Sequence, residues 1–276
     1  MNENDVLPGY VEKDYEELTI TDNFLFGKIM RNPRLCKKLL EIILDIEIER
    51  IEYPETEKNI DIVRDAKSIR LDVYVSDDKG SVYNVEMQAT ANENLPKRSR
   101  YYQGMIDLNL IEKGADYIEL NRSYVIFICT FDPFGYEQLV YQFENRCVNQ
   151  LKLALPDETT KIFINTKGTK GKVKAELREL IKVFNGIPGE KGYAKEVSDA
   201  IERAKKNREW RKEYMTMVEM EKEIYRKGIE QGITQEAQRI YQEMYANGVP
   251  IEQIARMTGC TEDYVRELLD MKQPLL

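Results

Sequence analysis

Hydrophobic and polar residues alternate along two neighbouring stretches of the chain. The first is "RLDVYVSD" (70–77), the second is "SVYNVEMQ" (81–88), and Asp78-Lys79-Gly80 connects them. A period of two predicts β-strands. A three-residue connection that ends in glycine predicts a hairpin loop with that glycine in the left-handed conformation. Residue 77 then faces residue 81, which sets the register of the whole hairpin.

Polar side chains interrupt this predicted hairpin at facing positions. The register places Asp72 directly opposite Glu86, and Arg70 opposite Gln88. Facing residues have Cβ atoms about 4.5–5.5 Å apart, so the two carboxylates would repel each other. Either Arg70 neutralises a neighbour, or a divalent cation such as Mg²⁺ binds between the carboxylates. If this face is instead open to water, the same side chains are ordinary surface residues, and the D-x13-E-x-Q spacing alone is a weak motif.

The surrounding pattern predicts an α/β domain. Residues 21–45 and 97–114 have helical periodicity, and residues 48–55 alternate like a short strand. Residues 124–131 form an apolar run that is typical of a strand buried on both faces. The order is therefore helix, three strands, helix, strand. On the second helix we expect a buried face made of Tyr101, Met105, Leu108 and Ile111.

The chain becomes helical after a further predicted strand at residues 161–168. We expect three parts: a main domain at 1–195, a helical arm at 196–246, and a small unit at 247–276. The small unit has helix-turn-helix spacing, with a turn at Gly259 and a second helix capped by Thr261.

The second helix of that small unit is acidic. It carries Glu262, Asp263, Glu267 and Asp270, with Arg266 as its basic residue. Such a surface repels phosphates. DNA binding by this unit and dimerisation or packing through the C-terminal helices therefore both stay open.

Composition excludes several kinds of chemistry. The 276 residues include no histidine, which excludes Ser-His and Cys-His nucleophiles and zinc sites with histidine ligands. The four cysteines are scattered, so neither a zinc site nor a disulfide framework is expected. The net charge of -8 argues against a surface that grips nucleic acid everywhere, but it permits a local basic face. We see neither a membrane-spanning run nor a signal peptide, so we expect a cytoplasmic protein.

Several segments resemble a known family. "RLDVYV", "YNVEMQ", the Tyr-Tyr helix and "YVIFICTFDPFG" resemble the PD-(D/E)XK nuclease superfamily. More narrowly, with "TDNFLFGKIM" and "KGIEQGITQEAQ", the chain is similar to the Rpn recombination-promoting nucleases, which are also described as transposases. The likeness covers most of residues 18–245 and is most specific in the middle. It implies a restriction-endonuclease-like αβββαβ core, within the α/β (α+β) class, and DNA cleavage that depends on Mg²⁺, with Mn²⁺ as a substitute.

The resemblance also implies roles for three hairpin residues. Asp72 and Glu86 correspond to the metal-binding acids. Gln88 stands where most of the superfamily has a lysine that positions or activates the attacking water. Glutamine cannot carry that positive charge, although it is usual in the Rpn-like branch. This departure puts full catalytic power in doubt.

Other residues are candidates for completing the site. A basic residue of the next helix, Lys97, Arg98 or Arg100, would supply the missing charge. The superfamily often adds a carboxylate from the first helix, for which Glu41 is the candidate, ahead of Asp22. Asp22 also fits the position of a helix cap.

The sequence therefore supports three interpretations. The first is a metal-dependent DNA endonuclease linked to recombination or mobile elements. The second is a non-catalytic nucleic-acid or protein-interaction module that keeps the nuclease fold. The third is a helix-turn-helix regulator with a large sensor domain. DNA is the expected partner, a membrane is not, and a homodimer through the C-terminal helices is a further expectation.

Overall fold

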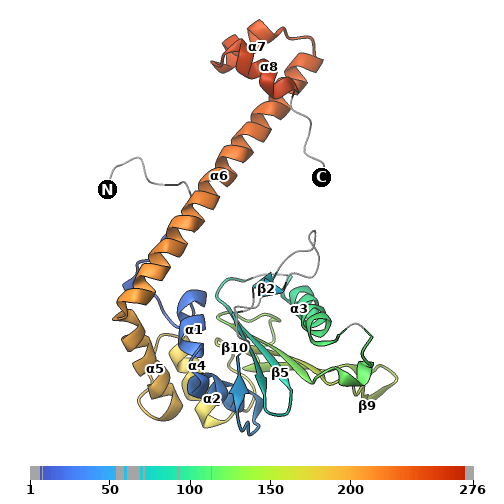
Figure 1. Ribbon diagram of the computed structural model, residues 1–276, viewed down its shortest axis with the longest axis vertical. Coiled ribbons are helices and arrows are strands. Elements are labelled where there is room, and N and C mark those ends of the chain that lie inside the picture. Colours follow the sequence, from blue (N-terminus) through green and yellow to red (C-terminus); the bar gives the residue numbers. More distant parts are fainter. Residues whose placement is uncertain are drawn as a thin grey trace. The chain divides into compact units, whose positions relative to one another are not determined.

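The structure is a computed structural model that describes residues 7, 9–53, 59–60, 69–70, 72–91, 94–112 and 114–270, with the backbone alone at 59–60 and 69–70. Two compact units make up the chain. The larger unit is Asp14–Arg211, and the smaller unit combines Met1–Lys13 with Lys212–Leu276. Helix α5 thus belongs to the larger unit, which contains the sheet (Figure 1).

A mixed six-stranded sheet forms the centre of the larger unit. Its strands are, in spatial order, β1 (Ile51–Glu52), β4 (Val73–Asp77), β5 (Val82–Gln88), β6 (Ser123–Cys129), β10 (Thr159–Asn165) and β7 (Val140–Phe143). The pairs β5–β6 and β6–β10 are parallel, and the outer pairs are antiparallel. Two small antiparallel pairs accompany the sheet: β2 (Asn59–Ile60) with β3 (Ile69–Arg70), and β8 (Arg146–Cys147) with β9 (Gln150–Ala154).

Helices cover both faces of this sheet (Figure 1). One face carries α1 (Asn23–Met30), α2 (Pro33–Leu44), α4 (Ala175–Phe184) and α5 (Gly192–Lys205), and the other carries α3 (Leu95–Leu110). Short 3-10 turns lie at η2 (Tyr15–Glu17) and η3 (Tyr117–Glu119). The start of α2 shows why the sequence forms a helix there. Asn32 accepts hydrogen bonds from the backbone amides of Arg34 and Leu35, and Pro33 occupies the first helical position.

The element order α2, β1, β4, β5, α3, β6 confirms the predicted αβββαβ core. The further strand predicted near residues 161–168 is β10. Helix α3 connects the parallel strands β5 and β6, whose carboxyl ends, Gln88 and Cys129, lie side by side.

The predicted hairpin register is confirmed from Val73 to Ser76, but the predicted strand at 70–77 is broken before Val73: Asp72 lies at a bend, and Arg70 belongs to β3, where it pairs with Asn59 and not with Gln88 as predicted. Val73 pairs with Val85 and Val75 with Tyr83. The amide of Asp77 donates to the carbonyl of Ser81 at 2.9 Å, which closes the loop. Gly80 has a φ of 81°, the left-handed conformation that the loop requires.

The face that α3 buries differs from the predicted one. Tyr102, Met105 and Ile106 pack against Val125 and Phe127 of β6, while two predicted core residues, Tyr101 and Leu108, are exposed. The prediction was wrong because apolar residues on this helix fit two neighbouring stripes, which both contain Met105, at the 3.6-residue repeat. The choice between them depends on the sheet beneath, which a single helix does not encode.

The smaller unit consists of helices. The 39-residue α6 (Arg208–Ala246) begins at the end of the larger unit, and α7 (Ile251–Thr258) and α8 (Glu262–Asp270) follow it. Gly259 ends α7 in the left-handed conformation, and Thr261 accepts the Tyr264 amide at 3.3 Å. A small core joins the three helices: Tyr241, Ile254, Ala255, Val265 and Leu268. Among the described residues, every helix is too short or too polar to cross a membrane.

Candidate active site

The structure brings Asp72 and Glu86 together at the open end of the β4–β5 hairpin. Asp72 lies at a bend directly before β4, and Glu86 lies within β5. The backbone amide of Asp72 donates to Oε1 of Glu86 at 3.1 Å. In return, Oδ2 of Asp72 accepts the backbone amide of Met87 at 3.0 Å. These reciprocal bonds hold each carboxylate against the opposite strand.

Helix α1 supports this arrangement from behind. A Cβ atom added to Gly27 would lie 3.6 Å from the backbone carbonyl oxygen of Asp72. The helix backbone therefore approaches the bend closely. The position of Asp72 is set by α1 on one side and by β5 on the other.

Glu86 is in an environment that disfavours its charge. Its side chain is only 1% exposed. Burial, followed by the nearby charge of Asp72, raises the pKa of Glu86 to about 8, although the Asp72 amide, Arg98 and Asn84 act in the opposite direction. The fully buried Asn84 precedes Glu86 by two residues and so shares its face of β5. Burial and the neighbouring carboxylate thus both favour the neutral form of Glu86.

Arg98 reaches this site from the first turns of α3. Its Nη2 donates to Oε2 of Glu86 at 3.0 Å, and its Nη1 donates to Oε1 of Gln88 at 2.6 Å. The other end of the Gln88 amide, Nε2, donates to the carbonyl of Thr90 at 2.7 Å. Gln88 is thereby held in one orientation at the carboxyl end of β5.

Of the three basic candidates on α3, Arg98 is the one that the structure brings to the carboxylates. Lys97 and Arg100 are exposed. Arg100 follows Arg98 by two residues, which is a rotation of about 200° around a helix, so it projects from nearly the opposite side.

Tyr102 holds Arg98 in place, a role that the sequence pattern had not assigned to it. Its hydroxyl accepts a hydrogen bond from Nε of Arg98 at 2.9 Å, and the guanidinium lies 5.1 Å from the centre of the Tyr102 ring. The ring also stacks on Phe127, with centroids 6.0 Å apart. Burial raises the pKa of Tyr102 to about 12, so the phenol stays neutral. The signal was available, because residues four apart on a helix are neighbours.

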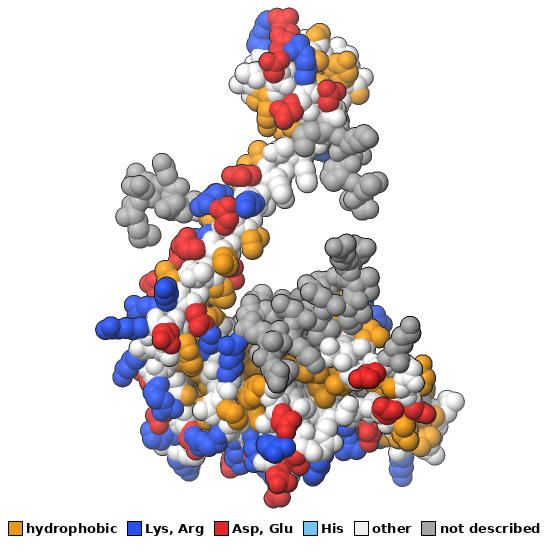
Figure 2. Space-filling model, viewed as in Figure 1, with side chains coloured by type: hydrophobic (Ala, Val, Ile, Leu, Met, Phe, Trp, Pro, Cys, Tyr) orange, Lys and Arg blue, Asp and Glu red, His pale blue; other side chains and the backbone are white. Residues whose placement is uncertain are grey.

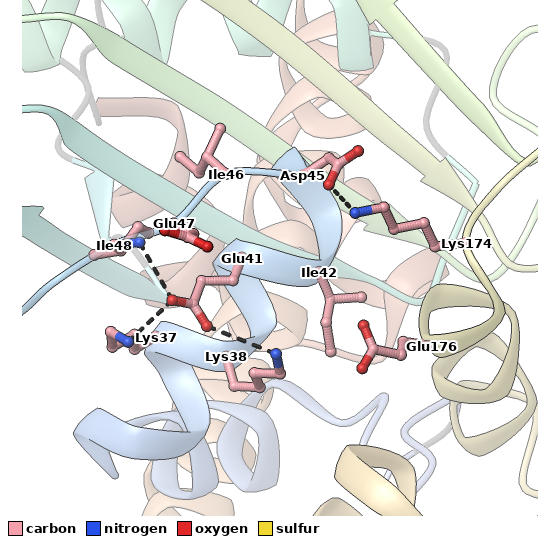
Figure 3. Close-up of a pocket in the computed structure, with 10 residues that line it drawn as sticks. All are labelled: Lys37, Lys38, Glu41, Ile42, Asp45, Ile46, Glu47, Ile48, Lys174 and Glu176. Carbon is pink, nitrogen blue, oxygen red and sulfur yellow. Dashed lines mark hydrogen bonds and ion pairs between the residues drawn. The ribbon is translucent and has the colours of Figure 1, made fainter.

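The remaining carboxylate candidates are engaged elsewhere. Oε1 of Glu41 accepts hydrogen bonds from Nζ of Lys37 at 2.9 Å and from the Ile48 backbone amide at 3.2 Å (Figure 3). Burial alone would raise the pKa of Glu41, but these hydrogen bonds lower it. Asp22 occupies the cap position of α1, and its Oδ2 accepts the Thr19 amide at 2.7 Å.

Glu41 lines a pocket between the end of α2 and the segment before α4. The pocket has a volume of about 550 Å³ and contains three lysines and four acidic residues. Lys174 and Asp45 form an ion pair across it (Figure 3). Its charges are largely paired among themselves. The side chain of Arg70, the other candidate, lies outside the described residues.

The donors at the hairpin fit a divalent cation with oxygen ligands. They are two carboxylates and one amide oxygen, which suit Mg²⁺ or Mn²⁺. Burial and the neighbouring Asp72 raise the pKa of Glu86, so a bound cation would stabilise the charged form of this carboxyl. Within the described part of the chain, no group of three or more acidic or cysteine side chains forms a metal cluster. The fit therefore rests on this pair, with water and substrate oxygens as the remaining ligands.

Comparison with known proteins places this geometry in context. The model of a family described as "PD-(D/E)XK nuclease family transposase" matches residues 23–233, which include the hairpin and α3. Neither a search of curated proteins nor a search of solved structures found a match.

Proposed function

The chain belongs to the PD-(D/E)XK nuclease family transposases, and on this basis we propose that it is a metal-dependent endonuclease that hydrolyses phosphodiester bonds in DNA. The observation that carries the proposal is the pair of Asp72, half-buried at a bend, and Glu86, buried in β5, whose carboxylates each accept a hydrogen bond from a backbone amide of the facing segment. Two carboxylates in such a place are costly unless a cation accompanies them.

Each residue of the site would have a distinct task. Asp72 and Glu86 would hold Mg²⁺, or Mn²⁺ in its place. The bound ion would lower the pKa of a coordinated water and stabilise charge on the phosphate. Gln88 would orient the water through its fixed amide. Arg98 would supply the positive charge that glutamine lacks and stabilise the charge that develops on the phosphorus oxygens.

Other elements of the proposal rest on resemblance or pattern. We propose that the chain is related to the Rpn nucleases and acts in recombination or at mobile elements. A cytoplasmic location is part of the same proposal. A homodimer through the C-terminal helices is supported by exposed apolar residues on α6, among them Met220, Ile224 and Ile233.

The test is nicking of supercoiled plasmid in the presence of Mg²⁺, with EDTA as the blank. Asp72→Asn keeps the shape of the side chain and removes its charge, so we expect cleavage to fall by more than about 10²-fold. Asp78→Asn is the matched control, because it makes the same change in the exposed loop of the same hairpin. Equal rates for Asp72→Asn and the wild type would refute the assignment.

A non-catalytic binding module is the second candidate, and two observations favour it. The Arg98 guanidinium already donates hydrogen bonds to the side-chain oxygens of Glu86 and Gln88 that a metal site would use. On the face seen in Figure 2, basic and acidic side chains are interspersed over the larger unit, so the described residues of that face form no extended basic track for DNA. Calorimetry separates the candidates. An endonuclease should bind Mn²⁺ in a manner that Glu86→Ala abolishes, whereas a binding module should give no such heat.

A further inference from the structure

The Arg98 guanidinium and a catalytic metal ion would compete for the same oxygens. Arg98 donates to Oε2 of Glu86 and to Oε1 of Gln88. The other Glu86 oxygen is turned towards the Asp72 amide, and Asp72 itself bonds to the Met87 amide. An ion held by Asp72 and Glu86, with a water oriented by Gln88, would therefore need the Glu86 and Gln88 oxygens that the guanidinium now holds.

Electrostatics forbids simple coexistence at these atoms. A divalent ion and a guanidinium that share one carboxylate oxygen are like charges at close range in a poorly solvated position. Conversely, a buried Glu86 beside Asp72 with no cation at all is strongly disfavoured. One cation at a time satisfies both conditions.

The surroundings of Arg98 allow it to move without leaving the site. Its side chain is 30% exposed, so its neighbours enclose Arg98 only in part. Nε is held by Tyr102, and the planar group lies over the rings of Tyr102 and Phe127, at 5.1 and 5.5 Å from their centres. These contacts hold the inner part of the group. The two Nη atoms could turn outward, where they would match two oxygens of a phosphate.

We infer that Arg98 is an exchangeable counter-ion of Glu86: it neutralises the carboxylate before metal binds, and metal binding releases it to contact the phosphate of the substrate. Tyr102 is the positioning residue that keeps Arg98 within reach of both. This inference rests on the proposed nuclease function. It adds that metal loading and phosphate binding are coupled through one side chain.

The test is the affinity for Mn²⁺ in the absence of DNA, measured by titration calorimetry. Arg98→Gln removes the competing charge, so Mn²⁺ should bind about tenfold more tightly or better, although cleavage is lost. Arg98→Lys keeps the charge and should bind Mn²⁺ within about threefold of the wild type. Arg100→Gln, the same change on the exposed side of α3, should alter Mn²⁺ affinity by less than about twofold.

Tyr102→Phe tests the positioning role. It keeps the ring and removes the oxygen that holds Nε. We expect kcat to fall while Mn²⁺ binding is not weakened, a combination that general disruption of the site would not produce. Weaker Mn²⁺ binding in Tyr102→Phe would overturn the positioning role.

The outcomes also separate this inference from the proposed function. Suppose that the wild type binds Mn²⁺ and cleaves DNA. Weaker or unchanged Mn²⁺ binding in Arg98→Gln would then overturn the exchange alone. Absence of Mn²⁺ binding and of cleavage in the wild type would overturn the proposed function and the exchange together.

Discussion

The burial of Glu86 beside Asp72 predicts an unusual dependence of stability on pH. The carboxyl has a pKa of about 8 in the folded protein, against an ordinary value of 4.5. Because the folded-state pKa is the higher one, the folded protein holds this proton more firmly than the unfolded chain does. The stability that Glu86 contributes is therefore fully present below about pH 4.5 and is lost as pH rises through about 8.

The shift sets the size of the effect. Each pKa unit corresponds to about 1.36 kcal/mol. Between pH 4.5 and pH 9, the metal-free protein should therefore lose at most about 5 kcal/mol of its free energy of unfolding through Glu86. Glu86→Gln cannot ionise and should escape this loss. Relative to the wild type, the variant should gain several kcal/mol in free energy of unfolding between pH 5 and pH 9.

Urea unfolding followed by circular dichroism, in EDTA, measures this difference. Exposed Glu202→Gln on α5 is the matched control and should follow the wild-type curve. Mg²⁺ should restore stability at pH 9 in the wild type more than in Glu86→Gln, because an ion that binds only the folded state stabilises it. If the free energy of unfolding changed equally with pH in Glu86→Gln and in the wild type from pH 5 to pH 9, the raised pKa of the buried Glu86 carboxyl would be contradicted.

Two further substitutions test the framework around the site. Gly80→Ala should destabilise the protein by roughly 1–2 kcal/mol in urea unfolding, because Gly80 has a φ of 81° and a Cβ there would lie 2.8 Å from Nδ2 of Asn121; unchanged stability would argue against this loop conformation. Leu268→Ala removes a side chain that is 2% exposed in the small C-terminal core. It should cost roughly 2–5 kcal/mol, seen as faster proteolysis near residues 247–270, and uniform proteolysis along the chain would contradict a separate core.

Local rules predicted the hairpin well, because everything needed lies within it. The glycine at position 80 sets the loop, the loop sets the register, and the register places Asp72 against Glu86. The order of core elements followed from periodicity in the same way.

Contacts between distant elements were harder to predict. The sequence has three basic residues near the start of α3. The packing of that helix on β6 determines that Arg98 is the one that reaches Glu86. The same packing exposes Tyr101, which was expected in the core, and buries Tyr102 instead. Glu41 looked like a ligand because of its helix, yet its bonds to Lys37 and the Ile48 amide depend on how the chain returns towards β1.

The short β4–β5 connection constrains how this chain can vary over evolutionary time. One added residue in the Asp78–Gly80 loop would slip one strand against the other and turn every side chain beyond it to the opposite surface. Such an insertion could leave the helices and the apolar interior nearly intact while separating the two acids. Length changes at this exposed tip are ordinarily among the most tolerated in a protein. Here they should be selected against unless each side chain of the hairpin keeps its face of the sheet.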